Sequence, residues 1–375
     1  MSKIIIELLA ILVLSFLFSC NRDEEPIDNE EEFEEYLMDE MDAQHIPALA
    51  TMVFDDESVL YESYLGKSSL ETNERLTGKD KFLLASVSKV ITATTLLQLY
   101  DQGLIALDHP VNDYLDFEVK VPGYSKEITF KMLLTHTSGI ADGSALDNQY
   151  YYGEDSPVAL DFFMKNYLEV GGEFYSISEN FHDFEPGSTY EYSNVGSALL
   201  AVLVEQLTGE PFVNYCRDNI FTPLGMTNTF WRLDAVTGTI VQPYDYVSGS
   251  NQKIEHYTFT DYPNGGLRST AADLHKLLME LSSDDGSAKL GLSAKTLTEM
   301  LTVQFRSGED QVGLHIFKMD NELGIWGHDG GEQRVATIMA FHPTNNIGAI
   351  LLCNQGEADL EDMLLEAYEF GLEIN

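Results

Sequence analysis

The sequence has 375 residues, 44% of them hydrophobic, and is long enough to form a large buried core divided between two lobes. Its 62 acidic and 21 basic residues leave a formal net charge of −41, which would repel the phosphate backbone of a nucleic acid and excludes nucleic-acid binding. The three cysteines include no Cys-x-x-Cys pair, so a disulfide framework and a thiolate zinc site are excluded. The nine histidines show no His-Glu-x-x-His or other compact ligand spacing, and we expect neither a metal nor a cofactor.

The N-terminal segment has the pattern of a secretion signal followed by a tether. Lys3 precedes an apolar run over residues 4–18, which is shorter than the roughly 20 apolar residues needed to span a bilayer. An acidic stretch follows Cys20 directly, and such stretches repel themselves and stay solvated. The junction resembles a bacterial lipoprotein signal, which implies a signal peptide over residues 1–19, lipidation of Cys20, and a tether over residues 20–33. The alternative is an apolar run retained as a membrane anchor.

The remaining domain, residues 34–375, would then lie outside the cytoplasm, anchored to the cell envelope on its periplasmic or outer surface. Residues 47–54 and 58–65 are apolar, β-rich runs around a short acidic turn, which predicts a hairpin. Apolar residues recur at helical spacing over residues 86–100, which predicts a largely buried helix that ends near Gly103.

The middle of the domain is predicted to be mainly helix and loop, and its most apolar helix covers residues 197–207 and ends at Gly209. Four β-rich runs separated by Asn, Gly and Pro turns then predict an antiparallel meander, over residues 312–317, 323–326, 335–341 and 347–352. A helix over residues 358–370 closes the chain. This order predicts an α/β fold: an antiparallel sheet built from both chain ends and flanked by helices, with an inserted, mainly helical lobe.

A first candidate motif, Ser86-Val87-Ser88-Lys89, begins the predicted helix 86–100. Its spacing of three places the Ser86 hydroxyl and the Lys89 amine on one helical face, beside the partial positive charge of the helix N-terminus. A serine is a weak nucleophile until a group takes its proton, and a desolvated lysine can have a pKa low enough to help. The pattern alone is not specific, because Ser250-Asn251-Gln252-Lys253 also fits it, in a polar loop without a following helix.

Two further motifs carry groups that acyl transfer needs. In Tyr192-Ser193-Asn194, a tyrosine near a lysine can act as base toward a serine and later as acid toward a leaving group, and Asn194 can orient an amide or ester. In Gly327-His328-Asp329-Gly330-Gly331, consecutive glycines allow close approach of backbone to a ligand, and the N–H groups of Gly331 and Ser86 could form an oxyanion hole. Read alone, each motif is also compatible with an ordinary turn.

In this order the three motifs resemble the serine β-lactamase and penicillin-binding-protein superfamily, in particular its branch of class C β-lactamases, D-alanyl-D-alanine carboxypeptidases and esterases. Runs 128–139 and 263–274 support the resemblance, which covers about residues 34–370. It implies a sheet domain packed against a helical domain, with the site between them. The implied roles are Ser86 as nucleophile, Lys89 and Tyr192 as joint proton-transfer partners, Asn194 as substrate orienter, and His328, Asp329 and Gly330 as substrate-binding residues, with His328 lining the pocket opposite the serine.

The substrate expectation comes from a departure from this pattern. β-Lactamases carry Lys-Thr-Gly where this chain has His328-Asp329-Gly330. A lysine there attracts the carboxylate of a β-lactam, whereas a neutral histidine attracts it less and an aspartate repels it. Provided that Asp329 points into the pocket, we expect an acyl-enzyme hydrolase of uncharged or amine-bearing esters, amides or peptides, with weak β-lactamase activity at most. The rival hypothesis is a lipid-anchored, non-catalytic binding protein with the same fold, which senses or scaffolds cell-wall material.

Overall fold

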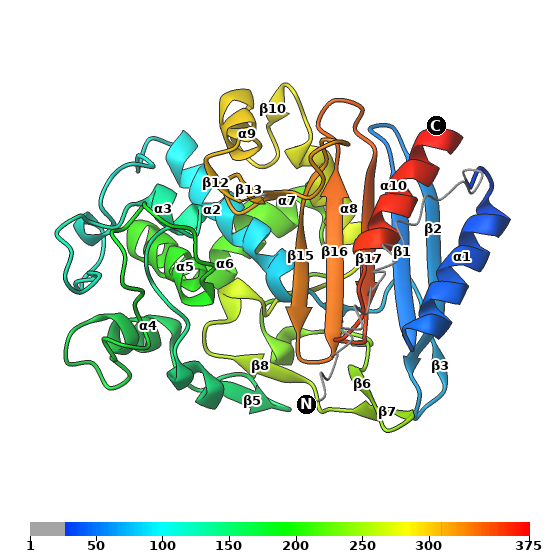
Figure 1. Ribbon diagram of the computed structural model, residues 1–375, viewed down its shortest axis with the longest axis horizontal. Coiled ribbons are helices and arrows are strands. Elements are labelled where there is room, and N and C mark those ends of the chain that lie inside the picture. Colours follow the sequence, from blue (N-terminus) through cyan, green and yellow to red (C-terminus); the bar gives the residue numbers. More distant parts are fainter. Residues whose placement is uncertain (1–26, 309) are drawn as a thin grey trace, which may run out of the picture.

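The two ends of the chain form one antiparallel sheet of nine strands in the computed structural model, which describes residues 27–308 and 310–375 (Figure 1). In order across the sheet, its strands are β12 (Phe305–Ser307), β13 (Asp310–Val312), β14 (Phe317–Lys318), β15 (Trp326–Glu332), β16 (Val335–Phe341), β17 (Gly348–Cys353), β1 (Ala48–Phe54), β2 (Val59–Ser69) and β3 (Glu74–Arg75). Strand β1 pairs with β17, with Thr51 opposite Leu351, so the ends of the chain meet at the centre. The predicted fold class is confirmed.

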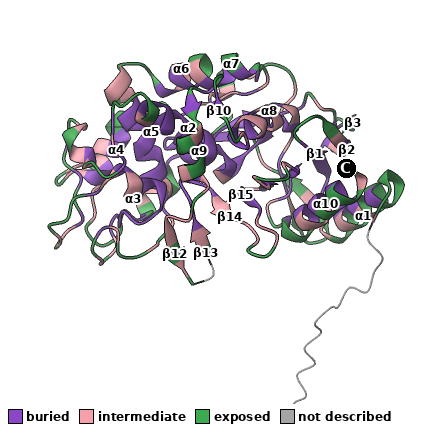
Figure 2. Ribbon diagram, turned by 90° about the horizontal axis from the view of Figure 1, so that it is seen from above, coloured by how far each residue is buried: buried purple, intermediate pink, exposed green. Residues whose placement is uncertain are grey.

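Helices cover both faces of this sheet and form a lobe beside it (Figure 1). Their bounds are α1 (Glu30–Ala43), α2 (Ser88–Asp101), α3 (Phe130–Leu134), α4 (Leu160–Leu168), α5 (Asn194–Thr208), α6 (Phe212–Cys216), α7 (Thr222–Leu224), α8 (Ala271–Leu281), α9 (Ala294–Met300) and α10 (Glu361–Ile374). Helices α1 and α10 lie side by side on one face of the sheet, and α8 lies on the opposite face (Figures 1 and 2). The lobe that carries α2 to α7 lies beyond β15.

Alternate side chains of the central strands enter two separate cores, one on each face. Leu49, Val53 and Leu351 pack in the core under α1 and α10. Met52 and Ile350 point the other way, into the larger core that continues into the helical lobe. Because both faces are covered, β1, β16 and β17 are buried along their whole length, as expected for strands between two layers.

The helical lobe is organised around two buried helices, α2 and α5, which pack against each other. Both were predicted, and α5 ends as expected at Gly209, which has a left-handed φ of +71°. Four short strand pairs lie outside the large sheet: β4 (Phe82–Leu83) with β9 (Arg268–Ser269), β5 (Tyr150–Tyr152) with β8 (Tyr257–Phe259), β6 (Tyr244–Val247) with β7 (Ser250–Lys253), and β10 (Gly286–Ser287) with β11 (Leu292–Ser293). The second Ser-x-x-Lys pattern forms β7 and does not begin a helix.

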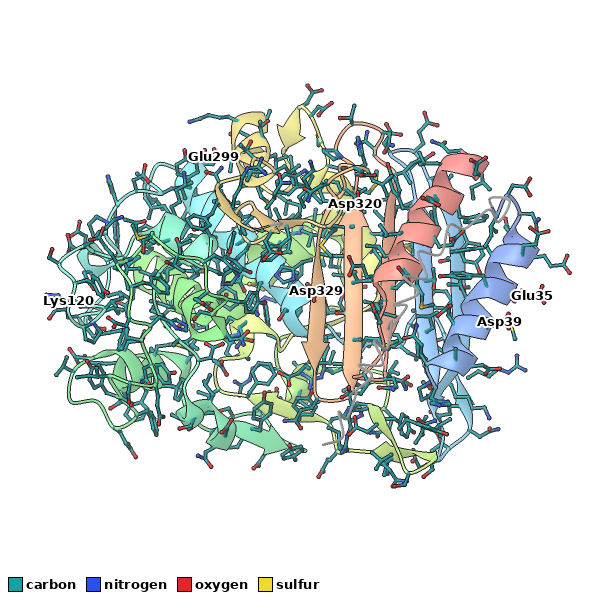
Figure 3. The ribbon with its side chains drawn as sticks, viewed as in Figure 1. Glu35, Asp39, Lys120, Glu299, Asp320 and Asp329 are labelled. Atoms are coloured by element: carbon teal, nitrogen blue, oxygen red, sulfur yellow. The ribbon has the colours of Figure 1, made fainter. Side chains whose placement is uncertain are left out.

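The ordered domain begins earlier than the sequence predicted, because α1 starts at Glu30, within the stretch that we expected to be a tether. The Asn29 side chain caps the helix by accepting a hydrogen bond from the Glu32 N–H at 3.0 Å. Phe33 and Leu37 are fully buried against the sheet, whereas Glu35 and Asp39 lie on the outer side of the helix (Figure 3). The acidic residues therefore occupy the solvated face of an amphipathic helix.

The signal peptide and the lipidation of Cys20 fall outside the described residues and stay predictions. Across the part of the chain that the structure describes, none of the helices combines the length and apolar character that crossing a membrane requires.

The meander differs from the prediction at the glycine motif. Strand β15 includes the whole Gly327–Gly331 motif, which we expected at a strand end, and pairs with β16 along its length, with His328 opposite Met339. The apolar β16 provides a complete hydrogen-bonding partner, and this pairing outweighs the low strand propensity of glycine. Residues 313–316, predicted to continue a strand, connect β13 to β14, and α10 begins at Glu361 rather than at residue 358.

Candidate active site

Ser86 and Lys89 meet at the point where the chain enters α2. Ser86 lies in the short 3-10 turn η1 (Ala85–Val87), and Lys89 lies in the first turn of α2. The Lys89 Nζ is 3.0 Å from the Ser86 Oγ, as the spacing of three residues implies. Ala85 has a φ of +48°, a left-handed conformation that costs energy in a residue with a Cβ. The backbone is thus held in an unusual conformation immediately before the serine.

Lys89 is fully buried and has three hydrogen-bond partners. Besides Ser86, its Nζ donates to Asn194 Oδ1 and to the Asn264 carbonyl oxygen, each at 2.7 Å. Burial lowers the pKa of Lys89 from 10.5 to about 7, against the opposing effect of nearby carboxylates. A large share of the amine is therefore neutral near neutral pH, and its lone pair can accept the proton of the Ser86 hydroxyl.

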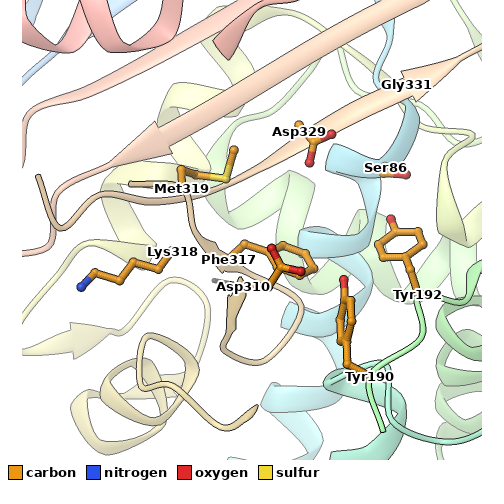
Figure 4. A pocket seen from close by; sticks show the side chains of 9 residues that line it. All are labelled: Ser86, Tyr190, Tyr192, Asp310, Phe317, Lys318, Met319, Asp329 and Gly331. Atoms are coloured by element: carbon orange, nitrogen blue, oxygen red, sulfur yellow. The ribbon is translucent and has the colours of Figure 1, made fainter. Parts of the chain in front are cut away.

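Tyr192 lies two residues before α5, and its hydroxyl points toward Ser86 (Figure 4). The Lys89 Nζ lies 4.9 Å from the centre of the Tyr192 ring, so serine, lysine and phenol converge from two different segments. Burial raises the pKa of Tyr192, and the neighbouring Ser86 hydroxyl partly opposes this shift. The phenol is therefore a proton donor in the resting site, suited to protonating a leaving group.

His328 does not lie where the sequence predicted. Adjacent strand residues point to opposite faces, and β15 directs His328 inward, where it is 1% exposed, behind Tyr192 rather than in the cavity. Its ring makes edge contacts with Phe317 and Tyr192, and its Nδ1 lies 2.6 Å from the Asp329 carbonyl oxygen. Burial lowers the pKa of His328 to about 4, so the ring is neutral at physiological pH. The predicted contact between His328 and substrate is replaced by a supporting contact behind the tyrosine.

A cavity of about 470 Å³ opens in front of Ser86 (Figure 4). The side chains and backbone that line it are Ser86, Tyr190, Tyr192, Asp310, Phe317, Lys318, Met319, Asp329 and Gly331. Asp329 alternates with His328 along β15, and its side chain is 71% exposed at the cavity. The condition on which the substrate expectation depended, that Asp329 points into the pocket, is met.

Gly330 and Gly331 bring β15 close to the serine in different ways. A Cβ at Gly330 would lie 2.5 Å from both the Leu84 carbonyl oxygen and Thr337 Oγ1, and 3.0 Å from the Ser86 nitrogen. Thr337 Oγ1 in turn donates to the Leu84 oxygen at 2.6 Å, which ties η1 to β16. Gly331 lines the cavity, where a Cβ would meet open space. Gly330 therefore packs against the backbone next to Ser86 and is not among the residues that line the cavity, and its predicted contact with substrate and the oxyanion hole of Ser86 and Gly331 stay predictions.

Comparisons with known proteins identify the family of this chain. The family model described as Beta-lactamase matches residues 33–369. The chain belongs to the Beta-lactamase family. It is 30% identical over 331 residues to penicillin-binding protein 4 of Amycolatopsis lactamdurans, which covers 84% of this chain and 82% of that protein.

Two further similarities concern a longer relative and a solved structure. The chain is 29% identical over 325 residues to Beta-lactamase-like protein 4 of Dictyostelium discoideum, which covers 80% of this chain and 55% of that protein, so it spans about half the length of that relative. Among solved structures, EstCE1, described as a hydrolase with promiscuous acyltransferase activity, superimposes with a TM-score of 0.74 at 17% identity, covering 91% of this chain and 98% of that chain. This last similarity shows the shared fold.

In this member of the Beta-lactamase family, sequence reasoning missed two carboxylates near Lys89. Asp142 accepts hydrogen bonds at the start of α5, and Asp261 accepts from the Asn264 side chain at 2.7 Å. Burial raises the pKa of Asp261 to about 7. Both residues are far from Lys89 in sequence, and only the pairing of distant segments brings them near it. Among the described residues, no group of three or more His, Cys, Asp or Glu side chains is arranged to hold a metal ion.

Gly330→Ala should impair both stability and acylation. The added methyl group would press on the Leu84 oxygen and on Thr337, and overpacking of this kind typically costs about 1–3 kcal/mol. We expect a lower melting temperature and at least a tenfold slower reaction of Ser86 with an active-site label, measured by thermal unfolding and single-turnover labelling. Gly331→Ala is the matched control for stability, because its methyl group meets no atom within 4 Å. Wild-type stability and labelling rate in Gly330→Ala would contradict the supporting role.

Proposed function

We propose that this protein is a serine hydrolase that cleaves an ester or amide through an acyl-enzyme at Ser86. The observation that carries the proposal is the convergence of Lys89 Nζ, at 3.0 Å, and the Tyr192 hydroxyl upon the Ser86 Oγ, in front of a cavity large enough for a small substrate. Membership of the Beta-lactamase family supports it.

In the proposed reaction, the Lys89 and Tyr192 pair takes the Ser86 proton as Oγ attacks the carbonyl carbon. The N–H groups of Ser86 and Gly331 stabilise the oxyanion, a contribution typically of about 2.7–4 kcal/mol for one such donor. The pair then returns the proton to the leaving alcohol or amine as the bond to it breaks. Water, deprotonated by the same pair, attacks the acyl-enzyme and releases the acid, which restores the serine.

A fluorescent fluorophosphonate tests the proposal directly, because it reacts with an activated serine and needs no knowledge of the natural substrate. The folded protein should become labelled, and peptide mass mapping should place the label on Ser86. A folded sample that neither reacts with the label nor hydrolyses any of a panel of esters and amides would instead support the non-catalytic binding protein.

The charge of the cavity indicates the substrate class. Asp310 and Asp329 contribute two carboxylates to its lining, whereas the amine of Lys318 points away from Ser86 (Figure 4). Burial is the main cause of the raised pKa of Tyr192, and the charge of Asp329 adds to it, as expected for a carboxylate near the reacting groups. We therefore propose uncharged or amine-bearing esters, amides and peptides as substrates, with carboxylate-bearing β-lactams disfavoured.

Asp329→Asn should relax this preference. Removal of the charge should raise kcat/KM for a chromogenic cephalosporin several-fold relative to kcat/KM for a neutral short acyl ester, and should lower it for an amine-bearing amide. Steady-state kinetics with the three substrates measures the change, and Asp56→Asn, an exposed site on the distant β1–β2 hairpin, is the control. A wild-type protein that cleaved the cephalosporin as fast as the short ester would refute the proposed preference.

A further inference from the structure

Asp142 connects the start of α5 to the reacting groups. Its Oδ2 accepts a hydrogen bond from the Asn194 N–H at 2.9 Å. Its Oδ1 accepts from the Val195 N–H at 3.0 Å and from the Ser193 hydroxyl at 3.3 Å. The side chain of Asn194 in turn accepts from Lys89 at 2.7 Å. One carboxylate thus holds the first turn of α5, which presents Asn194 to the buried amine.

The negative charge of Asp142 also acts on Lys89. Among the carboxylates that favour the charged form of Lys89, Asp142 has the largest effect, ahead of Asp261, Glu332 and Asp329. The other titratable groups that face Lys89 are Tyr192 and the buried rings of His136, His315 and His328. Burial raises the pKa of the tyrosine and lowers the pKa of each of the three histidines. These four groups are therefore uncharged near neutral pH. Asp142 is exposed, so its effect reaches the site partly through solvent.

We propose that Asp142 is a positioning residue of the proposed serine hydrolase, which fixes the Asn194 amide against Lys89 and holds the ammonium form of Lys89 with its negative charge. The inference rests on the proposed function, because its effect is measured on the reaction of Ser86. It concerns a residue that touches neither the serine nor the cavity lining, and acts through α5 and through its field.

The sign of the expected effect does not depend on which member of the proton-transfer pair is the base. The Asp142 charge raises the pKa of Lys89 and also that of Tyr192. Removal of the charge lowers both, so the deprotonated, reactive form of the pair exists at lower pH. The ascending limb of kcat/KM against pH, which reports the free enzyme, should move toward acid.

The test compares Asp142→Asn with wild type in the pH dependence of kcat/KM for a neutral short acyl ester and of the rate of fluorophosphonate labelling. We expect the ascending limb to move toward acid by about half a pH unit or more, and by more at low ionic strength, because salt screens an exposed charge. Asp142→Ser, whose shorter side chain also lacks the charge, should show the same shift toward acid and is the second variant if Asp142→Asn does not fold.

Asp155→Asn is the matched control. Asp155 also accepts two backbone N–H bonds, from Leu233 and Asp234, each at 2.9 Å, but it is not among the carboxylates with the largest effect on the pKa of Lys89. Its loss should reduce stability without moving the limb. An ascending limb that stays in place in both Asp142 variants, moves equally in Asp155→Asn, or is missing from the wild-type profile would overturn the inference. Failure of the wild-type protein to react with label or ester would instead overturn the proposed function.

Discussion

Ser86→Ala should abolish fluorophosphonate labelling and lower kcat/KM for a short acyl ester by on the order of 10⁴-fold or more, because loss of the nucleophile in serine hydrolases removes most of the rate enhancement. The change should leave stability nearly intact, since Ser86 is only partly buried and its hydroxyl is hydrogen-bonded to the side chain of Lys89. Gel fluorescence, steady-state kinetics and thermal unfolding of the same preparation measure the three quantities.

The chain contains its own control for this experiment. Ser250 has the same Ser-x-x-Lys spacing, but both Ser250 and Lys253 lie exposed on β7, so this lysine is not desolvated as Lys89 is. Ser250→Ala should therefore keep wild-type labelling and turnover. Undiminished labelling of Ser86→Ala would refute the assignment of the nucleophile, and so would loss of labelling in Ser250→Ala with labelling kept in Ser86→Ala.

Lys89→Met should lower the catalytic rate and remove a pH dependence from the free energy of unfolding. The methionine fills a similar volume without an amine, and loss of general-base catalysis typically lowers the rate about 10²–10⁴-fold. In the folded wild-type protein, burial lowers the pKa of Lys89 to about 7, whereas the unfolded chain has the ordinary value near 10.5. Between pH 7 and 10.5 the unfolded state binds more protons, so this residue makes wild-type stability rise with pH.

The free energy of unfolding should therefore increase with pH in the wild type relative to Lys89→Met, by at most about 1.4 kcal/mol per pH unit, with the change complete near pH 10.5 and absent below pH 7. Urea denaturation at pH 6, 7, 8 and 9 measures the difference. Lys253→Met, at the exposed lysine of the second Ser-x-x-Lys pattern, should show no such slope. A difference between wild type and Lys89→Met that did not change with pH would show that Lys89 stays charged in the folded protein.

Several elements of the fold follow from local patterns, and the structure confirms them. The hairpin of β1 and β2, the buried helices α2 and α5, and the strands β16 and β17 each carry a continuous periodic or apolar signal. Such signals report burial, which is complete in β1, β16 and β17 and limited to one face in β2. The spacing of Ser86 and Lys89 is equally local, because three residues of helix place both groups on one face.

The predictions that failed depended on partners distant in the sequence. Helix α1 has few apolar residues, and its order comes from packing against β2 and against α10 from the other end of the chain, where Phe33 stacks on Phe370. The direction of His328 depends on the register of β15 against β16, and a shift of one residue would exchange it with Asp329. Neither partner can be identified from the local sequence.

The residues themselves specify the reactive pair, the apolar faces and the acidic charge of the chain, because each depends on near neighbours or on composition. The environment that makes the pair reactive comes from folding. Lys89 meets Asn194 across 105 positions and Asn264 across 175 positions of sequence, and burial by these segments is what lowers its pKa. Desolvation is a property of the packed whole, so the chemistry of Ser86 depends on contacts that no local stretch of sequence contains.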